Sequence, residues 1–205
     1  MCETRRAVKA VDTGHHLNDH PPVTDRSAPW TSAPAAPTQV SLVQVPRAAM
    51  AALMVGDLDG ATAASGLTFP PDLADGRMLG VWARRYHQIG DDPSSAEWVT
   101  RAVLADGVVI GAAGFHGPPD ERGMVEVGYG VAEGRRRQGY AKAILAALLR
   151  QATAEPTVTV LRATISPDNA ASLATVAGFG LVHVGEQWDD EDGLELIYEL
   201  PTAAA

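Results

Sequence analysis

The spacing of apolar residues marks two helical segments in the first half of the chain. Residues 45–66 read as a helix that breaks near Gly56, followed by a second helical stretch. Residues 77–89 carry another amphipathic pattern, with an apolar stripe that includes Trp82 and Ile89. The ordered part of the chain is therefore expected to begin with helices.

Strand patterns follow, and most of them pair as hairpins. Strands are predicted at residues 97–105, 108–115, 124–131, 158–165, 181–187 and 194–200. Asp106 and Gly107 form a turn between the first two, and WDDEDG joins the last two. Further helices at 134–150 and 169–177 introduce one strand–helix–strand crossover. This order predicts an α/β fold with a central mixed, mostly antiparallel, twisted sheet of about six to seven strands and helices on both faces.

The first part of the chain has no such pattern. Residues 1–38 hold five prolines among Thr, Ser and Ala and are predicted to be a disordered or loosely packed arm, which leaves 39–202 as the folded domain. His16 and His20 stand four residues apart in this arm, a spacing that suits two metal ligands on a helix. The nearby prolines favour a solvated tail instead, so no metal site is predicted.

Composition narrows the classes of partner. The 205 residues carry 25 acidic and 16 Lys and Arg side chains, a formal charge of −9, which disfavours general binding to nucleic acid or to an anionic membrane surface. Cys2 is the only cysteine, so neither an intrachain disulfide nor a thiolate zinc site is expected. No apolar run of about 18 residues and no signal-peptide pattern is present, and we expect a cytoplasmic monomer or homodimer.

A run of three arginines stands at the predicted start of the helix GRRRQGYAKAILAALLR. Cations oppose the partial positive charge at a helix N-terminus, so Arg135, Arg136 and Arg137 indicate a negative ligand there. Gly139 allows the backbone to approach closely, consecutive N–H groups cradle phosphate oxygens, and guanidinium groups bind them in bidentate fashion. The alternative is an exposed basic turn balanced by Glu133.

The strand before this helix, MVEVGYGV, presents two different faces. Val125, Val127, Tyr129 and Val131 share one face, and Glu126, Gly128 and Gly130 share the other. Two glycines on one face weaken a strand unless a ligand lies against its backbone. Together with the arginine-rich helix start, this face indicates a long ligand with a diphosphate at one end.

A dinucleotide-binding fold explains these glycines less well. Gly128, Gly130 and Gly134 miss the G-x-G-x-x-G spacing by one residue. The acidic ribose partner expected about 20 residues later is also absent.

The segment RRQGYA, residues 136–141, fits a known motif: Arg or Gln, any two residues, Gly, any residue, then Gly or Ala. This is the motif of the GNAT superfamily of N-acetyltransferases. With the order of elements above and the later segment SPDNAASLATVAGFGLVHVG, the chain resembles the branch that contains the ribosomal-protein N-terminal acetyltransferases. The chain is slightly shorter than usual for that branch between Ser172 and Gly178, which blurs the alignment that follows.

The resemblance implies a binding path for acetyl-CoA as co-substrate, without a metal. Its diphosphate is expected on the backbone N–H groups of Arg136, Arg137, Gln138, Gly139, Tyr140 and Ala141. Its pantetheine arm is expected along Val127, Gly128, Tyr129 and Val131, in a splay between strands 124–131 and 158–165, with Asn169 as a hydrogen-bonding partner. Backbone N–H groups near Val127 to Tyr129 are the candidates for stabilising the oxyanion.

Acetyl transfer to an amine also needs a base. Glu126 lies on the ligand-facing side of its strand and is one candidate, acting directly or through water; the alternative is a structural carboxylate. The related acetyltransferases are thought to draw a base from the last hairpin. The candidates in that region are Asp189, Asp190, Glu191 and Asp192, most of which also suit a solvated turn.

The departing thiolate needs an acid, and Ser172 matches the hydroxyl position of the branch. It shares a helix face with Asn169, which also suits an N-cap. His116 and His183 are expected to be ordinary strand residues, because neither has an evident acidic partner in the sequence.

The resemblance therefore implies an acetyl-CoA-dependent N-acetyltransferase that works by direct attack in a ternary complex. The acidic last hairpin favours a cationic acceptor: a protein N-terminus, a polyamine or an aminoglycoside-like amine. A non-catalytic protein that binds acyl-CoA as a sensor or interaction module is the alternative.

Overall fold

The structure is a computed structural model that describes residues 27–34, 36, 38–191 and 193–202. The strands are β1 (Trp30–Thr31), β2 (Ser41–Val43), β3 (Arg101–Ala105), β4 (Val108–Phe115), β5 (Met124–Val131), β6 (Val160–Ile165), β7 (Val182–Asp189) and β8 (Gly193–Pro201). The helices are α1 (Arg47–Leu53), α2 (Leu58–Ser65), α3 (Gly76–Asp91), α4 (Tyr140–Ala154) and α5 (Ala170–Ala177), with short 3₁₀ helices η1 (Pro71–Leu73), η2 (Pro93–Glu97) and η3 (Glu133–Arg135). His16 and His20 lie outside the described residues.

All the described strands form a single sheet in the order β1-β2-β3-β4-β5-β6-β8-β7. Neighbouring strands are antiparallel except β5 and β6, which are parallel and joined through α4. The predicted α/β fold with a mixed, mostly antiparallel sheet is confirmed, with eight strands where about six to seven were expected. Asp106 and Gly107 form the predicted hairpin turn and both have positive φ, as a two-residue turn of this kind requires.

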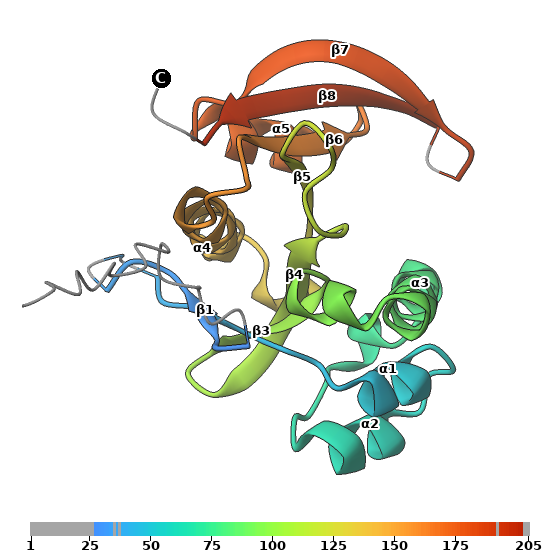
Figure 1. The fold of residues 1–205 in the computed structure, drawn as a ribbon. Coiled ribbons are helices and arrows are strands. Elements are labelled where there is room, and N and C mark those ends of the chain that lie inside the picture. The colour runs from blue at the N-terminus through green and yellow to red at the C-terminus, as the bar shows by residue number, and fades with distance from the viewer. Residues whose placement is uncertain (1–26, 35, 37, 192, 203–205) are drawn as a thin grey trace, which may run out of the picture.

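Helices cover both faces of the sheet (Figure 1). α1, α2 and α3 pack on one face around Trp82 and Leu53, and α4 and α5 pack on the other around Ile144. Val127 of β5 belongs to the second of these cores. Because side chains alternate along a strand, Glu126 and the glycines of β5 therefore face the side of α3.

Two strands that the hydrophobic pattern does not reveal complete one edge of the sheet. β1 and β2 are two and three residues long, too short to show a strand period. Trp30, which falls within the predicted N-terminal arm, pairs with Leu42 and is 4% exposed. Its ring centroid lies 5.2 Å from that of Phe115, so this aromatic pair is part of the core.

The strand predicted at 97–105 begins later than expected. Pro93 lies in the first turn of η2, and the Asp92 carboxylate accepts a hydrogen bond from the Ser94 N–H at 3.0 Å. Proline and an N-capping aspartate both favour a helical start. The chain therefore makes a 3₁₀ helix first, and the strand begins at Arg101.

Candidate active site

The parallel strands β5 and β6 part in the middle of the sheet. Their ladder ends at the pair Glu126 and Arg162. On the other edge of β5, His116 donates its N–H to the Glu126 carbonyl and Ala132 donates to Ile110, both at 2.8 Å. Backbone groups alternate between the two edges of a strand, so those of Tyr129 and Val131 point towards β6, beyond the end of the ladder.

The start of α4 lies at the end of this parted edge. Gly139 is the N-cap residue with φ 84°, Arg137 has φ 60°, and no side chain caps the helix. The sequence pattern had placed the arginine run in the first turn of the helix. In the structure the run precedes the helix. Arg136 donates from Nε to the Val131 carbonyl at 3.2 Å, which ties the loop to the end of β5. An uncapped helix start with exposed arginines beside it has the chemistry of an anion-binding site.

Tyr129 reaches from β5 towards α5. Its hydroxyl oxygen is buried and makes no hydrogen bond of normal geometry within the described part of the chain. Burial raises the pKa of the Tyr129 phenol, and the nearby Ser172 and Thr175 side chains oppose that shift. Asn169 accepts a hydrogen bond from the Ser172 N–H at 3.0 Å, so it is the N-cap of α5. The structure thus brings the predicted residues Tyr129, Ser172 and Asn169 together at one end of α5.

Glu126 is held by partners on the opposite face of β5. Thr164 donates its hydroxyl to Oε1 at 2.6 Å, and His116 Nδ1 lies 3.3 Å from the same oxygen. Burial raises the pKa of Glu126, but the hydrogen bonds from His116 and Thr164, with the charges of His116 and Arg162, outweigh it and lower the pKa below its usual value. Glu126 is therefore a carboxylate at neutral pH.

Two side chains of α3 fix the end of β4 beside this carboxylate. Arg85 Nη1 and Gln88 Nε2 donate to the His116 carbonyl at 2.7 and 2.9 Å. Arg85 is 5% exposed, and burial, together with the charge of Arg84, lowers its pKa to about 10. Arg85 thus remains a buried cation near the Glu126 carboxylate, whose charge raises the Arg85 pKa.

The buried position of Arg85 and the acidic partner of His116 were not predicted from the sequence. Arg85 lies on the buried stripe of α3 between Trp82 and Ile89, and a charged residue at such a position is a signal that can be found. His116, for which the sequence shows no evident acidic partner, has one in the fold, because the antiparallel register of β4 and β5 brings Glu126 beside it. Such a partner is not visible in the local sequence.

The acidic hairpin between β7 and β8 contacts α3. Arg84 Nη2 lies 2.9 Å from Glu191 Oε2, and both side chains are largely exposed. Asp189 accepts a hydrogen bond from the Glu191 N–H at 2.8 Å, as expected of a turn. Asp190 is exposed, and Asp192 lies outside the described residues. The contact with Arg84 thus joins this hairpin to α3.

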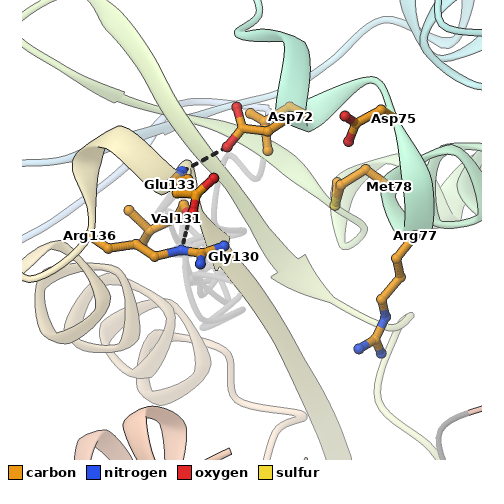
Figure 2. A pocket seen from close by; sticks show the side chains of 9 residues that line it. Asp72, Asp75, Arg77, Met78, Gly130, Val131, Glu133 and Arg136 are labelled. Atoms are coloured by element: carbon orange, nitrogen blue, oxygen red, sulfur yellow. Dashed lines mark hydrogen bonds between the residues drawn. The ribbon is translucent and has the colours of Figure 1, made fainter.

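A cavity of about 280 Å³ lies between the start of α3 and the end of β5. It is lined by Asp72, Leu73, Asp75, Arg77, Met78, Gly130, Val131, Glu133 and Arg136 (Figure 2). Asp72 accepts a hydrogen bond from the Glu133 N–H at 2.7 Å, which closes one wall. A Cβ atom on Gly130 would meet nothing within 4 Å, so the glycine face of β5 is open here. The mixed carboxylate and guanidinium lining suits a polar ligand.

The described part of the chain holds no candidate metal cluster and no candidate membrane-spanning helix. No group of three or more His, Cys, Asp or Glu side chains in this part of the chain is arranged to hold a metal ion. None of its helices combines the length and the hydropathy that crossing a bilayer requires.

Solved structures with the same fold come from several acetyltransferases. The Microcin C7 self-immunity acetyltransferase MccE, in complex with acetyl-CoA and AMP, has a TM-score of 0.56 at 11% identity and covers 81% of this chain and 93% of its own. The ribosomal L7/L12 acetyltransferase RimL, with coenzyme A, has a TM-score of 0.55 at 16% identity, covering 82% and 96%. RimJ of Mycobacterium smegmatis, with a CoA-disulfide, has a TM-score of 0.56 at 19% identity, covering 85% and 86%. At these identities the likeness is one of fold.

Sequence comparison identifies the family. The uncharacterized N-acetyltransferase YjdG of Bacillus subtilis (strain 168) is 34% identical over 74 residues, which are 36% of this chain and 44% of YjdG. The match therefore spans less than half of that relative. The family described as acetyltransferase (GNAT) domain matches residues 42–182, well over half of the chain. The predicted resemblance is confirmed, and the chain belongs to the GNAT acetyltransferase family.

Proposed function

We propose that the protein transfers an acetyl group from acetyl-CoA to a primary amine, by direct attack within a ternary complex. The observation that carries this proposal is the parted edge of β5, which leads directly to the uncapped, arginine-flanked start of α4. A strand edge without a partner strand suits the amide-bearing pantetheine arm, and the helix start suits the diphosphate.

The cofactor path follows the residues predicted from the motif. The N–H groups from Arg136 through Gln138 and Gly139 to Tyr140 and Ala141 hold the diphosphate, with Arg136 and Arg137 adding charge. The backbone of Val127, Gly128, Tyr129 and Val131 lies along the pantetheine. Asn169 serves as the N-cap of α5 and also presents its amide to that arm. The positive φ of Arg137 and Gly139 supports this path, because such turns direct successive N–H groups to one side.

Catalytic groups lie on both sides of the parted strand. N–H groups near Val127 and Tyr129 stabilise the oxyanion that forms on the thioester carbonyl. Ser172, beside the buried Tyr129 hydroxyl, supplies the proton that the leaving sulfur needs. Glu126 is an ionised carboxylate on the side of β5 that faces α3. It promotes loss of a proton from the acceptor amine, directly or through another group.

The reaction takes place in the cytoplasm. The acceptor is a cationic amine, such as a protein N-terminus, a polyamine or an aminoglycoside-like compound. Around the cavity on the glycine face of β5, the three carboxylates of Asp72, Asp75 and Glu133 outnumber the guanidinium groups of Arg77 and Arg136. The hairpin with Glu191 adds further negative charge near α3. Carboxylates on the open side of the strand attract a cationic acceptor over a neutral one.

The proposal is tested with a variant of the phosphate loop. Arg136→Glu combined with Gly139→Asp puts two carboxylates where the diphosphate belongs, and Asp is strained at the φ of 84°. We expect acetyl-CoA affinity to fall by more than about 100-fold, since each lost charge-assisted contact is worth roughly 1.5–3 kcal/mol. Isothermal titration calorimetry measures the affinity, and Arg150→Glu, at the far end of α4, is the control. Unchanged affinity in the double variant contradicts the proposal.

A panel of amines separates the enzyme from a protein that only binds acyl-CoA. Thiol release with at least one amine, and a mass increase of the acceptor by one acetyl group, supports transfer. Tight acetyl-CoA binding with no thiol release for protein N-termini, polyamines or aminoglycosides supports a sensor instead.

A further inference from the structure

The His116 imidazole lies between two groups of the candidate site. Its Nδ1 is 3.3 Å from Glu126 Oε1. A Cβ atom built on Gly128 would lie only 2.8 Å from its Nε2, so this nitrogen sits against the Cα of Gly128. The His116 side chain is 46% exposed and that of Glu126 is 19% exposed, so the imidazole is the more accessible member of the pair.

The contact with Glu126 selects one tautomer of the ring. A carboxylate only accepts hydrogen bonds, so Nδ1 carries the proton and Nε2 keeps a lone pair. Thr164 donates to the same carboxylate oxygen at 2.6 Å and fixes its position. The lone pair of Nε2 therefore lies at Gly128, next to Tyr129, in the stretch whose N–H groups are proposed to stabilise the oxyanion.

The backbone of His116 is anchored without help from its ring. Arg85 and Gln88 donate to its carbonyl at 2.7 and 2.9 Å. Its N–H donates to the Glu126 carbonyl at 2.8 Å. A substitution of the His116 side chain leaves all three bonds available, so the variant protein is expected to fold.

We propose that His116 is the catalytic base of this acetyl transfer and that Glu126 is its positioning residue, an inference that rests on the proposed function. His116 Nε2 accepts one proton from the acceptor ammonium group. The amine nitrogen then forms the C–N bond to the acetyl carbon, and the C–S bond breaks. Ser172 gives its proton to the leaving sulfur and takes the second amine proton in its place, so the products are an amide, a free thiol and a proton that the imidazolium returns to solvent. Glu126 stays ionised throughout and stabilises the imidazolium.

The geometry favours this division of roles over direct catalysis by the carboxylate. Glu126 Oε1 already receives the Thr164 hydroxyl and faces His116 Nδ1. The acceptor approaches from the α3 side, because the opposite side of β5 packs against α4. An acceptor that approaches from that side reaches the half-exposed His116 imidazole before the more buried Glu126 carboxylate.

The test compares His116→Gln, His116→Ala and Glu126→Gln in the full chain with an amine that the wild type acetylates. His183→Gln on β7 is the matched histidine control. For His116→Gln we expect kcat to fall about 10²-fold or more, the usual effect of losing a general base. The acetyl-CoA Kd and the acceptor KM should stay within about threefold. Added imidazole should restore part of kcat in His116→Ala and none in Glu126→Gln.

Each result has a defined meaning. A His116→Gln protein that keeps kcat within about threefold of the wild type, while Glu126→Gln is inactive, overturns the inference and leaves the proposed function intact. Failure of imidazole to restore any activity to a folded His116→Ala protein also overturns it. A wild-type chain that releases no thiol with any amine overturns the proposed function, and the inference with it. If His183→Gln loses as much kcat as His116→Gln, the effect comes from folding, and the catalytic role of His116 is overturned.

Discussion

The His116 ring comes close to β5 because Gly128 has no side chain. A Cβ atom there would lie 2.8 Å from Nε2 and 3.4 Å from Cδ2. Gly128 has no positive φ, so alanine fits the backbone and the clash must be relieved by movement of the ring. We expect Gly128→Ala to lower kcat by about 10²-fold, the usual order for a displacement of about 1 Å in an oriented site.

The matched control for this substitution is Gly185→Ala on β7. A Cβ atom at Gly185 would meet nothing within 4 Å, and its φ is also outside the positive range. Steady-state kinetics and thermal melting of both variants check the prediction. Full activity in a folded Gly128→Ala protein is incompatible with an imidazole held at this place.

Individual residues differ in how far the sequence reveals them. Glu126 and Gly128 could be assigned to one face of β5, because strand alternation is a local property. The N-cap at Asn169 could be predicted for the same reason. The contact of His116 with Glu126 could not, because it depends on the register of β4 and β5. The burial of the Tyr129 hydroxyl beside α5 depends likewise on how elements distant in sequence pack.

The helix α3 fixes the end of β4 through Arg85 and Gln88, which donate to the His116 carbonyl. Arg85→Ala removes a charged donor from the His116 carbonyl and leaves a gap around a side chain that is 5% exposed. Loss of the buried charge also relieves its desolvation cost, so the net effect is smaller than the lost bonds suggest. We expect the free energy of unfolding to fall by about 2 kcal/mol and kcat to fall with it, because the His116 backbone becomes less well fixed.

Arg84→Ala provides the neighbouring control on the same helix. Arg84 is 53% exposed, and its contact with the exposed Glu191 is expected to contribute less than about 1 kcal/mol. Urea unfolding followed by tryptophan fluorescence, together with kcat, compares the two variants. If both lose the same stability, the anchoring role of Arg85 is wrong.

Elements were predictable where their pattern is long. α3 and α4 span 16 and 15 residues, enough turns to show a helical period; both were predicted, and α3 lies close to its predicted bounds. β1 and β2 were missed because a strand of two or three residues has no measurable period. The start of α4 was placed too early, since the positive φ of Arg137 breaks a stretch whose composition suits a helix.

In the molecule as a whole, the parted sheet forms two halves with few bonds between them. β1 to β5 make one half and β6, β8 and β7 the other, and β5 and β6 share only three paired positions, from Met124 to Glu126. α4 follows β5 in the chain and packs in the same core as Val127 of β5 and Leu161 of β6. A ligand that lies along the parted edge would add bonds at this junction.

Acetyl-CoA is therefore expected to stabilise both halves of the sheet together. At a ligand concentration of 100 times Kd, binding contributes about 2.7 kcal/mol, which raises the Tm of a domain of this size by roughly 5–10 °C. Hydrogen exchange should slow at the amides of β5 beyond Glu126 and also in β6 and β8, because opening the junction now requires loss of the ligand. The Arg136→Glu and Gly139→Asp double variant should show neither effect. Protection confined to the start of α4, with β6 and β8 unchanged, would mean that the ligand binds by its diphosphate alone and does not bridge the two halves.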